Sequence, residues 1–326
     1  MYRLYGALAS PYSMKMRSLL RYRQLPFTWH DGASVQDALA NVRAPVIPVL
    51  EFPDGHFAND STPLVYELEE LHEERGIVPP DPAVAFLAHL IEDFADEWLT
   101  KAMFGWRWLA EVDQAQMSRW LAFDRMHGGG IDASQSAADK FRARQVGRMA
   151  LVGCTKENFP LIEASTHVVL QSLEAHVTES FFLFGSRPSL AEFGLFGQLS
   201  QLATDPTPQS MMREHFPYTY RWLAHLDDLS GHSGEWADEP SAAALRIAQV
   251  AGAVYAPFLV ANEAALDAGH DMLRFEALGH EFSQPVFKYQ AKCLADLRTR
   301  YKALSDAGRD RVDGWTGDGW RIALDT

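Results

Sequence analysis

The sequence has little of what several protein classes require. Its 326 residues include only two cysteines, Cys154 and Cys293, which lie far apart in the chain. This excludes a disulfide scaffold and any Cys-x-x-Cys metal or redox pair, and both thiols are expected to be buried. Basic residues are also outnumbered, with 29 against 43 acidic ones and a formal net charge of −14. A nucleic-acid-binding protein normally carries basic residues that neutralise phosphates, so nucleic acid is not an expected partner.

Long hydrophobic runs are missing as well. The most apolar stretch, residues 247–261, includes Gln249 and Pro257 and is shorter than the roughly 20 residues that a membrane span needs. We expect it to be a buried helix, with no membrane association. The N-terminus lacks the apolar core of a secretory signal, so a cytoplasmic location is expected. The histidines show no ligand spacing such as His-Glu-x-x-His, and no metal is expected.

What is present is the composition of an ordinary globular protein, with 47% apolar and 22% charged residues. The length exceeds one typical domain, so two domains are expected. In the first, Tyr2 and Leu4 alternate with polar residues as in a strand, and a helix should follow Ser10. The elements expected after that helix are a strand over 26–30, a polar and weakly helical connection over 31–43, strands over 48–52 and 56–58, and a helix from Asp60.

The proline-rich segment 78–82 is stiff and extended, which is typical of a connection between domains. We therefore expect a domain over residues 1–77, a linker over 78–85, and a second domain over 86–326 with an extended tail from about residue 231. Apolar residues recur at helical spacing throughout the second domain, which predicts an all-α bundle. Helical patterns are expected over 241–268, 271–282 and 285–307, and a mobile loop over 126–136, which contains three glycines.

Two expected helix beginnings carry residues that suit an anionic ligand. Ser10 precedes Pro11, so its hydroxyl should cap a helix whose first amides favour negative charge. A thiolate beside such a terminus, with a hydroxyl donating to it, would have a lowered pKa. Asp60 and Ser61 begin another helix and offer a carboxylate for an ammonium group, with amides and a hydroxyl for a carboxylate. In isolation, both motifs are more often simple caps.

Pro48 opens a strand that otherwise has an internal composition, and the Ile47-Pro48 bond is a candidate for the cis form. A cis proline would offer the Ile47 backbone to an extended peptide ligand. An ordinary trans bond at the start of a strand is the alternative. Farther along, Ser189 and Glu192 form a capping box, to which we assign a structural role only.

Taken in order, these residues resemble the glutathione transferase family, over residues 1–80 and the capping box. The resemblance implies an α/β thioredoxin-like N-terminal domain with a mixed four-stranded sheet, followed by an all-α helical bundle. It implies that Ser10 activates the thiol of glutathione, a co-substrate, and that glutathione binds at Tyr12, Ile47-Pro48 and Asp60-Ser61. Ser10 and Ser13 stand where glutaredoxins carry cysteines, which disfavours thiol-disulfide or dehydroascorbate reductase chemistry.

The resemblance further implies an enzyme in which the glutathione sulfur attacks a small hydrophobic electrophile. Candidates for the electrophile pocket are Trp98, Phe104 and Trp108, although aromatic residues at such spacing are more often core. A homodimer is expected. The alternative is a non-catalytic binding or scaffold protein that keeps the fold and uses the helical tail as a partner surface.

Overall fold

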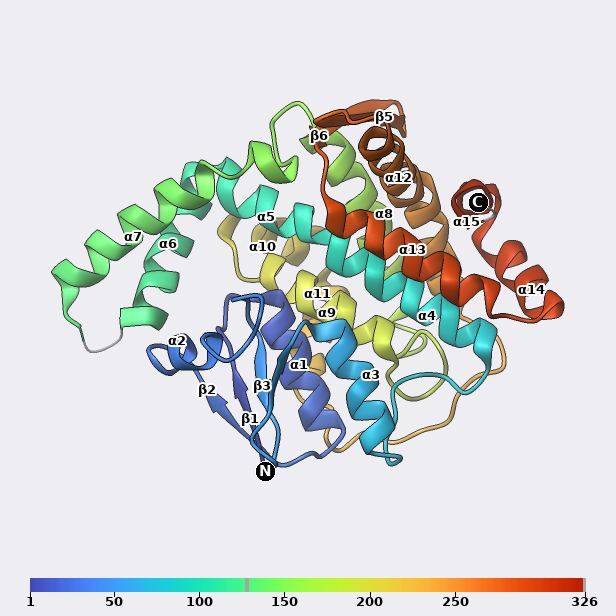
Figure 1. Cartoon of the computed structure of the whole chain (residues 1–326), viewed down its shortest axis with the longest axis horizontal. Coiled ribbons are helices and arrows are strands. Elements are labelled where there is room, and N and C mark those ends of the chain that lie inside the picture. The colour runs from blue at the N-terminus through green and yellow to red at the C-terminus, as the bar shows by residue number, and fades with distance from the viewer. Residues whose placement is uncertain (127–128, 325–326) are drawn as a thin grey trace.

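The N-terminal part of the chain is a small mixed sheet with helices, seen in a computed structural model that describes residues 1–126 and 129–324 (Figure 1). Its elements are β1 (Tyr2–Tyr5), α1 (Pro11–Tyr22), β2 (Phe27–His30), α2 (Ser34–Leu39), β3 (Val49–Glu51), β4 (Phe57–Asn59) and α3 (Ser61–Leu71). The strand order is β2-β1-β3-β4, with β2 parallel to β1 and the other neighbours antiparallel. This confirms the predicted thioredoxin-like domain and its order of elements.

The apolar pattern of the first residues explains how this sheet joins the rest of the molecule. Tyr2 and Leu4 are buried, whereas Arg3 between them is exposed, so β1 turns one face toward the core. Helices α1 and α3 contact each other, and α1 packs against α9 of the helical part. These two helices therefore lie between the sheet and the larger part of the chain, which brings their N-termini to the junction (Figure 1).

The remainder is mostly helical. Its helices are α4 (Pro82–Phe94), α5 (Thr100–Leu109), α6 (Glu111–Met126), α7 (Ile131–Val146), α8 (Phe159–His176), α9 (Leu190–Leu202), α10 (Pro206–His215), α11 (Pro217–Leu226), α12 (Ala242–Asp267), α13 (Lys288–Lys302), α14 (Asp306–Thr316) and α15 (Asp318–Leu324). A π-helical turn, Ala95–Leu99, joins α4 to α5. Helix α4 begins at Pro82, capped by Asp81, inside the range expected for the linker.

The predicted capping box is present at the start of α9. The Ser189 hydroxyl accepts from the Ala191 amide, and the Glu192 carboxylate accepts from the Ser189 amide at 2.8 Å. Both groups are fully buried, and the Glu192 carboxylate also accepts from the Leu183 amide. The box therefore joins the start of α9 to the preceding chain as well as capping the helix.

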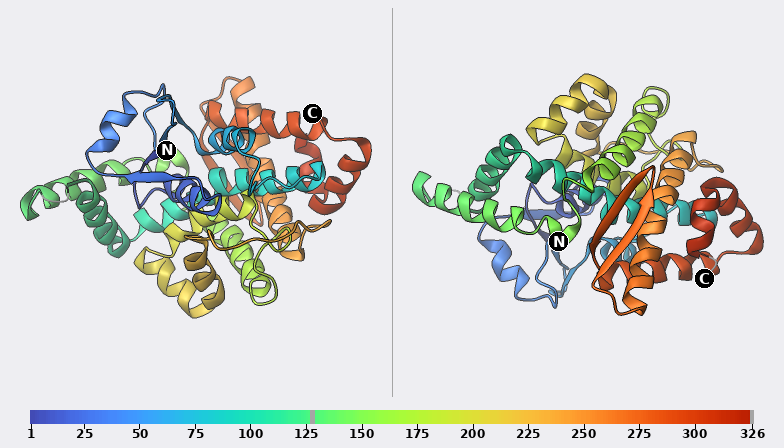
Figure 2. Two further views of the ribbon diagram at one scale, coloured as in Figure 1. Left: turned by 90° about the horizontal axis from the view of Figure 1, so that it is seen from below. Right: turned by 90° about the horizontal axis from the view of Figure 1, so that it is seen from above.

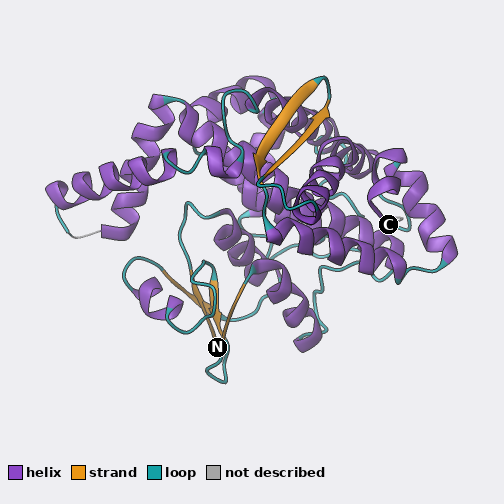
Figure 3. Ribbon diagram, turned by 45° about the horizontal axis from the view of Figure 1, so that its top comes forward, coloured by secondary structure: helices purple, strands orange, loops and turns teal. Residues whose placement is uncertain are grey.

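The tail contains a hairpin where the sequence analysis predicted helix over 271–282, and that prediction was wrong. Strands β5 (Met272–Ala277) and β6 (His280–Pro285) pair in an antiparallel ladder, apart from the N-terminal sheet (Figure 3). The turn residues Leu278 and Gly279 have φ of 48° and 75°, the combination of a type I′ turn. Leucine is an unusual residue in that turn, which explains why the hairpin was missed.

The segment predicted as a loop over 126–136 also differs, because α7 begins at Ile131. Of its three glycines, Gly128 lies outside the described residues. Helices α6 and α7 pack against each other as an antiparallel pair that projects from one end of the molecule (Figure 2).

Helix α12 is the long apolar segment that the sequence analysis expected to be buried, and it is. It is long and apolar enough to pass as a membrane span by composition, but 67% of its most apolar window is buried inside the protein. Helices α4, α8, α13 and α15 and strand β5 all contact it. We therefore identify it as the central core helix of the second part.

Candidate functional site

A cavity of about 520 Å³ lies at the junction of the two parts. Its walls come from the loop between β1 and α1, from the loop before β3, and from α5, α6 and α7. Three of the residues predicted for the glutathione site, Ser10, Tyr12 and Ile47, line it together. Arg125 and Arg148, both exposed, line it together with Asp31 and Asp124, so its wall carries charges of both signs. We call it the junction cavity.

Ser10 is the N-cap of α1, as predicted. Its hydroxyl oxygen accepts a hydrogen bond from the Ser13 amide at 3.3 Å, and Pro11 occupies the first helical position. A serine hydroxyl that accepts in this way still has its own proton to donate. Ser10 therefore presents a donor to the junction cavity beside a helix N-terminus that favours an anion.

Two residues of the helical part fix the loop that leads to Ser10. The Arg107 guanidinium donates to the Ala9 carbonyl at 3.1 Å, and the Gln201 amide donates to the Leu8 carbonyl at 3.0 Å. Arg107 also pairs with the buried Asp205 carboxylate at 2.9 Å. Burial raises the pKa of Asp205 to about 6 even with this cation beside it. Local sequence gives no signal for these contacts, because the partners are about a hundred or more residues apart.

The Ile47-Pro48 peptide bond is cis, the less common of the two forms that the local sequence left open. The Asn59 side-chain amide donates to the carbonyls of Ala44 and Val46 at 2.6 and 3.1 Å and so holds the loop that precedes it. Ile47 lines the junction cavity, whereas Pro48 is buried directly behind it. The loop thus brings Ile47 to the wall of the cavity.

Asp60 and Ser61 do not line the junction cavity, but the sheet places them next to it. Val49 pairs with Asn59, so Pro48 and Asp60 are the chain neighbours of one strand pair. Asp60 has φ of 75°, a conformation that a residue with a side chain adopts at a cost of about 1–3 kcal/mol. Backbone strain of this kind is common at functional sites, so we keep Asp60 as a candidate site residue.

Beneath these residues lies a buried ionic network around Lys15. Its ammonium group donates to Asp96 Oδ2 at 2.7 Å, to Ser61 Oγ at 3.3 Å and to the Glu92 carboxylate. Thr62 Oγ1 donates to Glu92 Oε1 at 2.5 Å. The network joins α1 and α3 to α4 and the π-helical turn. The same buried ion pairs therefore anchor both α1 and α3 to the helical part.

Burial and the neighbouring charges shift the pKa values of this network. Burial would lower the pKa of Lys15, but the carboxylates of Asp96 and Glu92 outweigh it and raise that pKa. For Glu92, burial opposes ionisation, but Lys15 holds the pKa below its usual range. Burial dominates at Asp96 and raises its pKa to about 7. Lys15 therefore stays protonated beneath the start of α3.

The hydroxyl of Tyr12 makes its hydrogen bonds within the protein, which does not fit the glutathione contact predicted for Tyr12. It donates to the Asp96 carbonyl at 2.9 Å and lies 3.4 Å from Thr100 Oγ1, and burial raises its pKa well above the usual value. Because this proton is already used within the protein, we assign no sulfur contact to the Tyr12 hydroxyl. Ser13 is fully buried, and its hydroxyl has no partner among the described residues.

Of the three aromatic residues predicted for the second pocket, two line the cavity. Phe104 and Trp108 of α5 line it, together with Phe141 of α7, whose ring lies 6.1 Å from that of Trp108. Trp98 does not line it, which corrects the prediction. It is fully buried, donates to Ser165 Oγ at 2.9 Å and packs on Phe282 of the hairpin. Phe141 was missed because the packing of α7 against α5 joins residues that are not neighbours in the chain.

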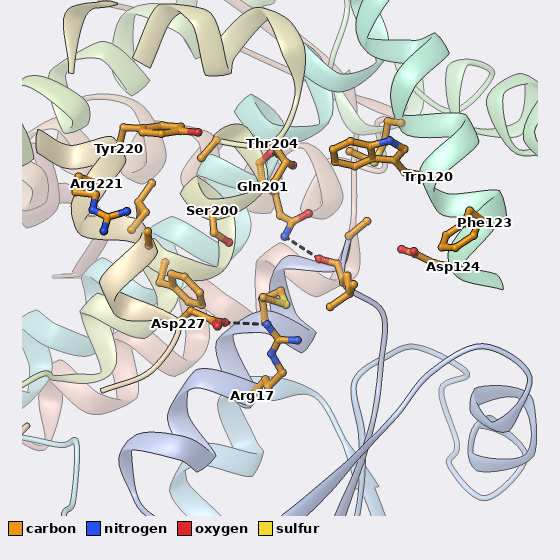
Figure 4. A pocket seen from close by; sticks show the side chains of 18 residues that line it. Arg17, Trp120, Phe123, Asp124, Ser200, Gln201, Thr204, Tyr220, Arg221 and Asp227 are labelled. Atoms are coloured by element: carbon orange, nitrogen blue, oxygen red, sulfur yellow. Dashed lines mark hydrogen bonds and ion pairs between the residues drawn. The ribbon is translucent and has the colours of Figure 1, made fainter. Parts of the chain in front are cut away.

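A second cavity, of about 640 Å³, lies on the other side of the Leu8-Ala9 loop (Figure 4). The figure shows Trp120 and Phe123 of α6 facing Gln201 and Thr204 across it, and the Arg17–Asp227 ion pair at 2.8 Å below. Leu8, Ala9 and Asp124 line both cavities. None of the predicted site residues lines this second cavity, so we assign the site to the junction cavity.

Known structures resemble this chain at low identity. A glutathione S-transferase from Rhodospirillum rubrum F11 is 20% identical over 69% of this chain and 86% of its own, with a TM-score of 0.44. A glutathione S-transferase from Methylobacterium radiotolerans JCM 2831, in complex with glutathione sulfonate, is 22% identical over 74% and 97%, with a TM-score of 0.41. The β-etherase LigF from Sphingobium sp. strain SYK-6 is 18% identical over 69% and 94%, with a TM-score of 0.45.

No protein of curated function matches the sequence. Residues 4–76 match the family model described as glutathione S-transferase, N-terminal domain. That range includes Ser10, the cis Ile47-Pro48 bond and the beginning of α3, and it ends before α4. The N-terminal domain of this chain is therefore similar to that of glutathione S-transferases.

Proposed function

We propose that the protein is a glutathione transferase that activates the thiol of glutathione at Ser10 for attack on a small hydrophobic electrophile. The observation that carries this proposal is the junction cavity, which Ser10, Pro11 at the start of α1 and Ile47 line together. Glutathione in an extended conformation would place its thiol at Ser10 and its cysteinyl backbone along Ile47. Its γ-glutamyl end would reach Asp60 and Ser61.

The chemistry follows from the local field. A thiol bound beside Ser10 would lose its proton more readily, because the hydroxyl and the partial positive charge of α1 both stabilise the thiolate. The thiolate sulfur would then form a bond to an electrophilic carbon, and the leaving group would depart with its electron pair. The second substrate would lie against Phe104, Trp108 and Phe141, which form an apolar wall of the cavity.

The experiment compares the wild-type protein with Ser10→Ala. Calorimetry first measures glutathione binding, and the ultraviolet absorbance of the thiolate then gives the thiol pKa in the complex. Losing one hydrogen bond to a charged group costs about 1.5–3 kcal/mol, and about 1.4 kcal/mol corresponds to one pKa unit. We therefore expect Ser10→Ala to raise the thiol pKa by about one to two units and to slow turnover.

Ser13→Ala is the matched control, because the Ser13 hydroxyl is fully buried without a partner among the described residues. It should leave the thiol pKa unchanged. If glutathione does not bind at millimolar concentration, the proposal is wrong. If it binds with an ordinary thiol pKa in both the wild type and Ser10→Ala, the protein binds glutathione without catalysing transfer, which is the alternative function.

The homodimer and the cytoplasmic location stay predictions. Helix α13 is relevant to the homodimer, because it lies along α4 and its Asp296 contacts His89 of α4 at 3.0 Å. A second copy that approached this face of α4 would meet α13. Sedimentation velocity tests the homodimer directly.

A further inference from the structure

The beginning of α13 reaches the predicted glutathione site from the far end of the chain. The Tyr289 hydroxyl donates to Asp60 Oδ2 at 3.3 Å. Next to it, the Gln290 amide donates to Glu97 Oε2 of the π-helical turn at 3.1 Å. The Tyr289 side chain is 46% exposed, so it stands at the rim of the site. The family match ends at residue 76 and does not include this contact.

Contacts with α12 and α3 hold the helix that carries Tyr289. The Asn262 side chain, fully buried in α12, makes two hydrogen bonds of 2.9 Å with the Phe287 backbone immediately before α13. Farther along the same helix, the Arg300 guanidinium lies 4.3 Å from the ring centroid of Tyr66 in α3. Helix α13 is therefore fixed to α12 at its start and to α3 beyond it, and Figure 1 shows it running alongside α4.

The environment of the Asp60 carboxylate explains why the Tyr289 hydroxyl donates a hydrogen bond to it. Burial raises the pKa of Asp60, which means that its carboxylate lacks the solvation of an exposed acid. Burial, with Glu97 and Asp60 nearby, also raises the pKa of Tyr289. The hydroxyl therefore keeps its proton and donates to the carboxylate. A carboxylate held by a donor on Oδ2 keeps a fixed orientation, and its Oδ1 is the oxygen left to meet a cationic ligand group.

We propose that Tyr289 is a positioning residue for the γ-glutamyl ammonium of glutathione, which it orients indirectly by holding the Asp60 carboxylate. This inference rests on the proposed function and extends the site to a segment more than two hundred residues beyond it. The tail then completes the glutathione site, and it sets the preference for a ligand with a free α-ammonium group at that end.

The test compares two thiol peptides, glutathione and cysteinylglycine, which lacks the γ-glutamyl group. With Tyr289→Phe, we expect the Kd and KM for glutathione to rise about tenfold, the size of one lost hydrogen bond to a charged group. The Kd for cysteinylglycine and the kcat with glutathione should stay unchanged. General damage to the fold would weaken the binding of both peptides.

Tyr301→Phe is the matched control. It removes another hydroxyl from α13 that donates to an aspartate, Asp313 Oδ1 at 2.7 Å, away from the site, and it should change neither peptide's affinity. Equal weakening of both peptides by Tyr289→Phe, or no change in either, would overturn the inference.

Asp60→Asn separates the failure of this inference from that of the proposed function. If Asp60→Asn weakens glutathione binding and Tyr289→Phe does not, the inference fails while the proposed function stands. If the wild-type protein binds no glutathione, the proposed function itself fails.

Discussion

Replacing Lys15 by methionine tests the buried network beneath the site. Methionine has a similar length and no charge, so Lys15→Met removes the cation and leaves Asp96 and Glu92 buried without it. Both carboxylates lie in the interior, where an uncompensated charge is costly. Breaking a buried ion pair by removing one partner typically costs about 3–5 kcal/mol of the free energy of unfolding.

The pH dependence makes this prediction sharper. In the wild type, burial raises the pKa of Asp96 to about 7, so the folded state holds a proton that the unfolded chain releases near its ordinary value of 3.8. The resulting stabilisation is present at low pH, is lost as the pH rises toward 7, and changes little above that. Without Lys15, the folded carboxylates hold protons to still higher pH. The stability of the variant should therefore keep falling above pH 7, by up to about 1.4 kcal/mol per pH unit for each proton.

The assay is urea unfolding of both proteins at about pH 6 and about pH 8, with the difference in free energy expected to be larger at the higher pH. Thr166→Val is the control, because Thr166 is also fully buried but its hydroxyl donates to the Ile162 carbonyl and carries no charge. Its loss should not become more costly as the pH rises. A cost for Lys15→Met that is equal at both pH values would refute the reasoning.

Two further predictions concern the packing and charge around the same helices. Burial raises the pKa of Asp93 to about 7, so Asp93→Asn should become more stable relative to the wild type as the pH rises from about 4 to about 7 and then stay level, measured by urea unfolding. A Cβ at Gly197 would lie 2.8 Å from the Pro11 carbonyl oxygen and 3.2 Å from Lys15 Cβ. Gly197→Ala should therefore lower the free energy of unfolding by about 1–3 kcal/mol, and unchanged stability in that variant would contradict the close packing of α9 on α1.

The parts of the site that the sequence predicted are those with a local signal. Ser10 before Pro11 predicts a capped helix from two neighbouring residues, and the structure has that cap. The Ser189–Glu192 box is likewise contained in four residues. The cis bond at Pro48 was suggested by a proline in a strand of otherwise internal composition. In each case the interacting groups are close in the chain, so the pattern carries the information.

The parts that were missed depend on residues brought together by folding. Lys15 meets Glu92 and Asp96 across 77 and 81 positions, and the Tyr289 contact spans 229. No local pattern marks either contact. Lysine is exposed in most proteins, so nothing in the sequence indicates that Lys15 is buried. The hairpin at Leu278-Gly279 was missed for a different reason, since leucine rarely occupies a turn with positive φ.

The π-helical turn Ala95–Leu99 determines which residues of α5 line the junction cavity. One residue inserted into a helix rotates everything after it by about 100° around the axis. The apolar face of α4 therefore does not continue in register into α5. Phe104 and Trp108 of α5 line the junction cavity, whereas Trp98, within the turn, is part of the core. Deleting a single residue of the turn would redirect the aromatic wall without altering any side chain that forms it.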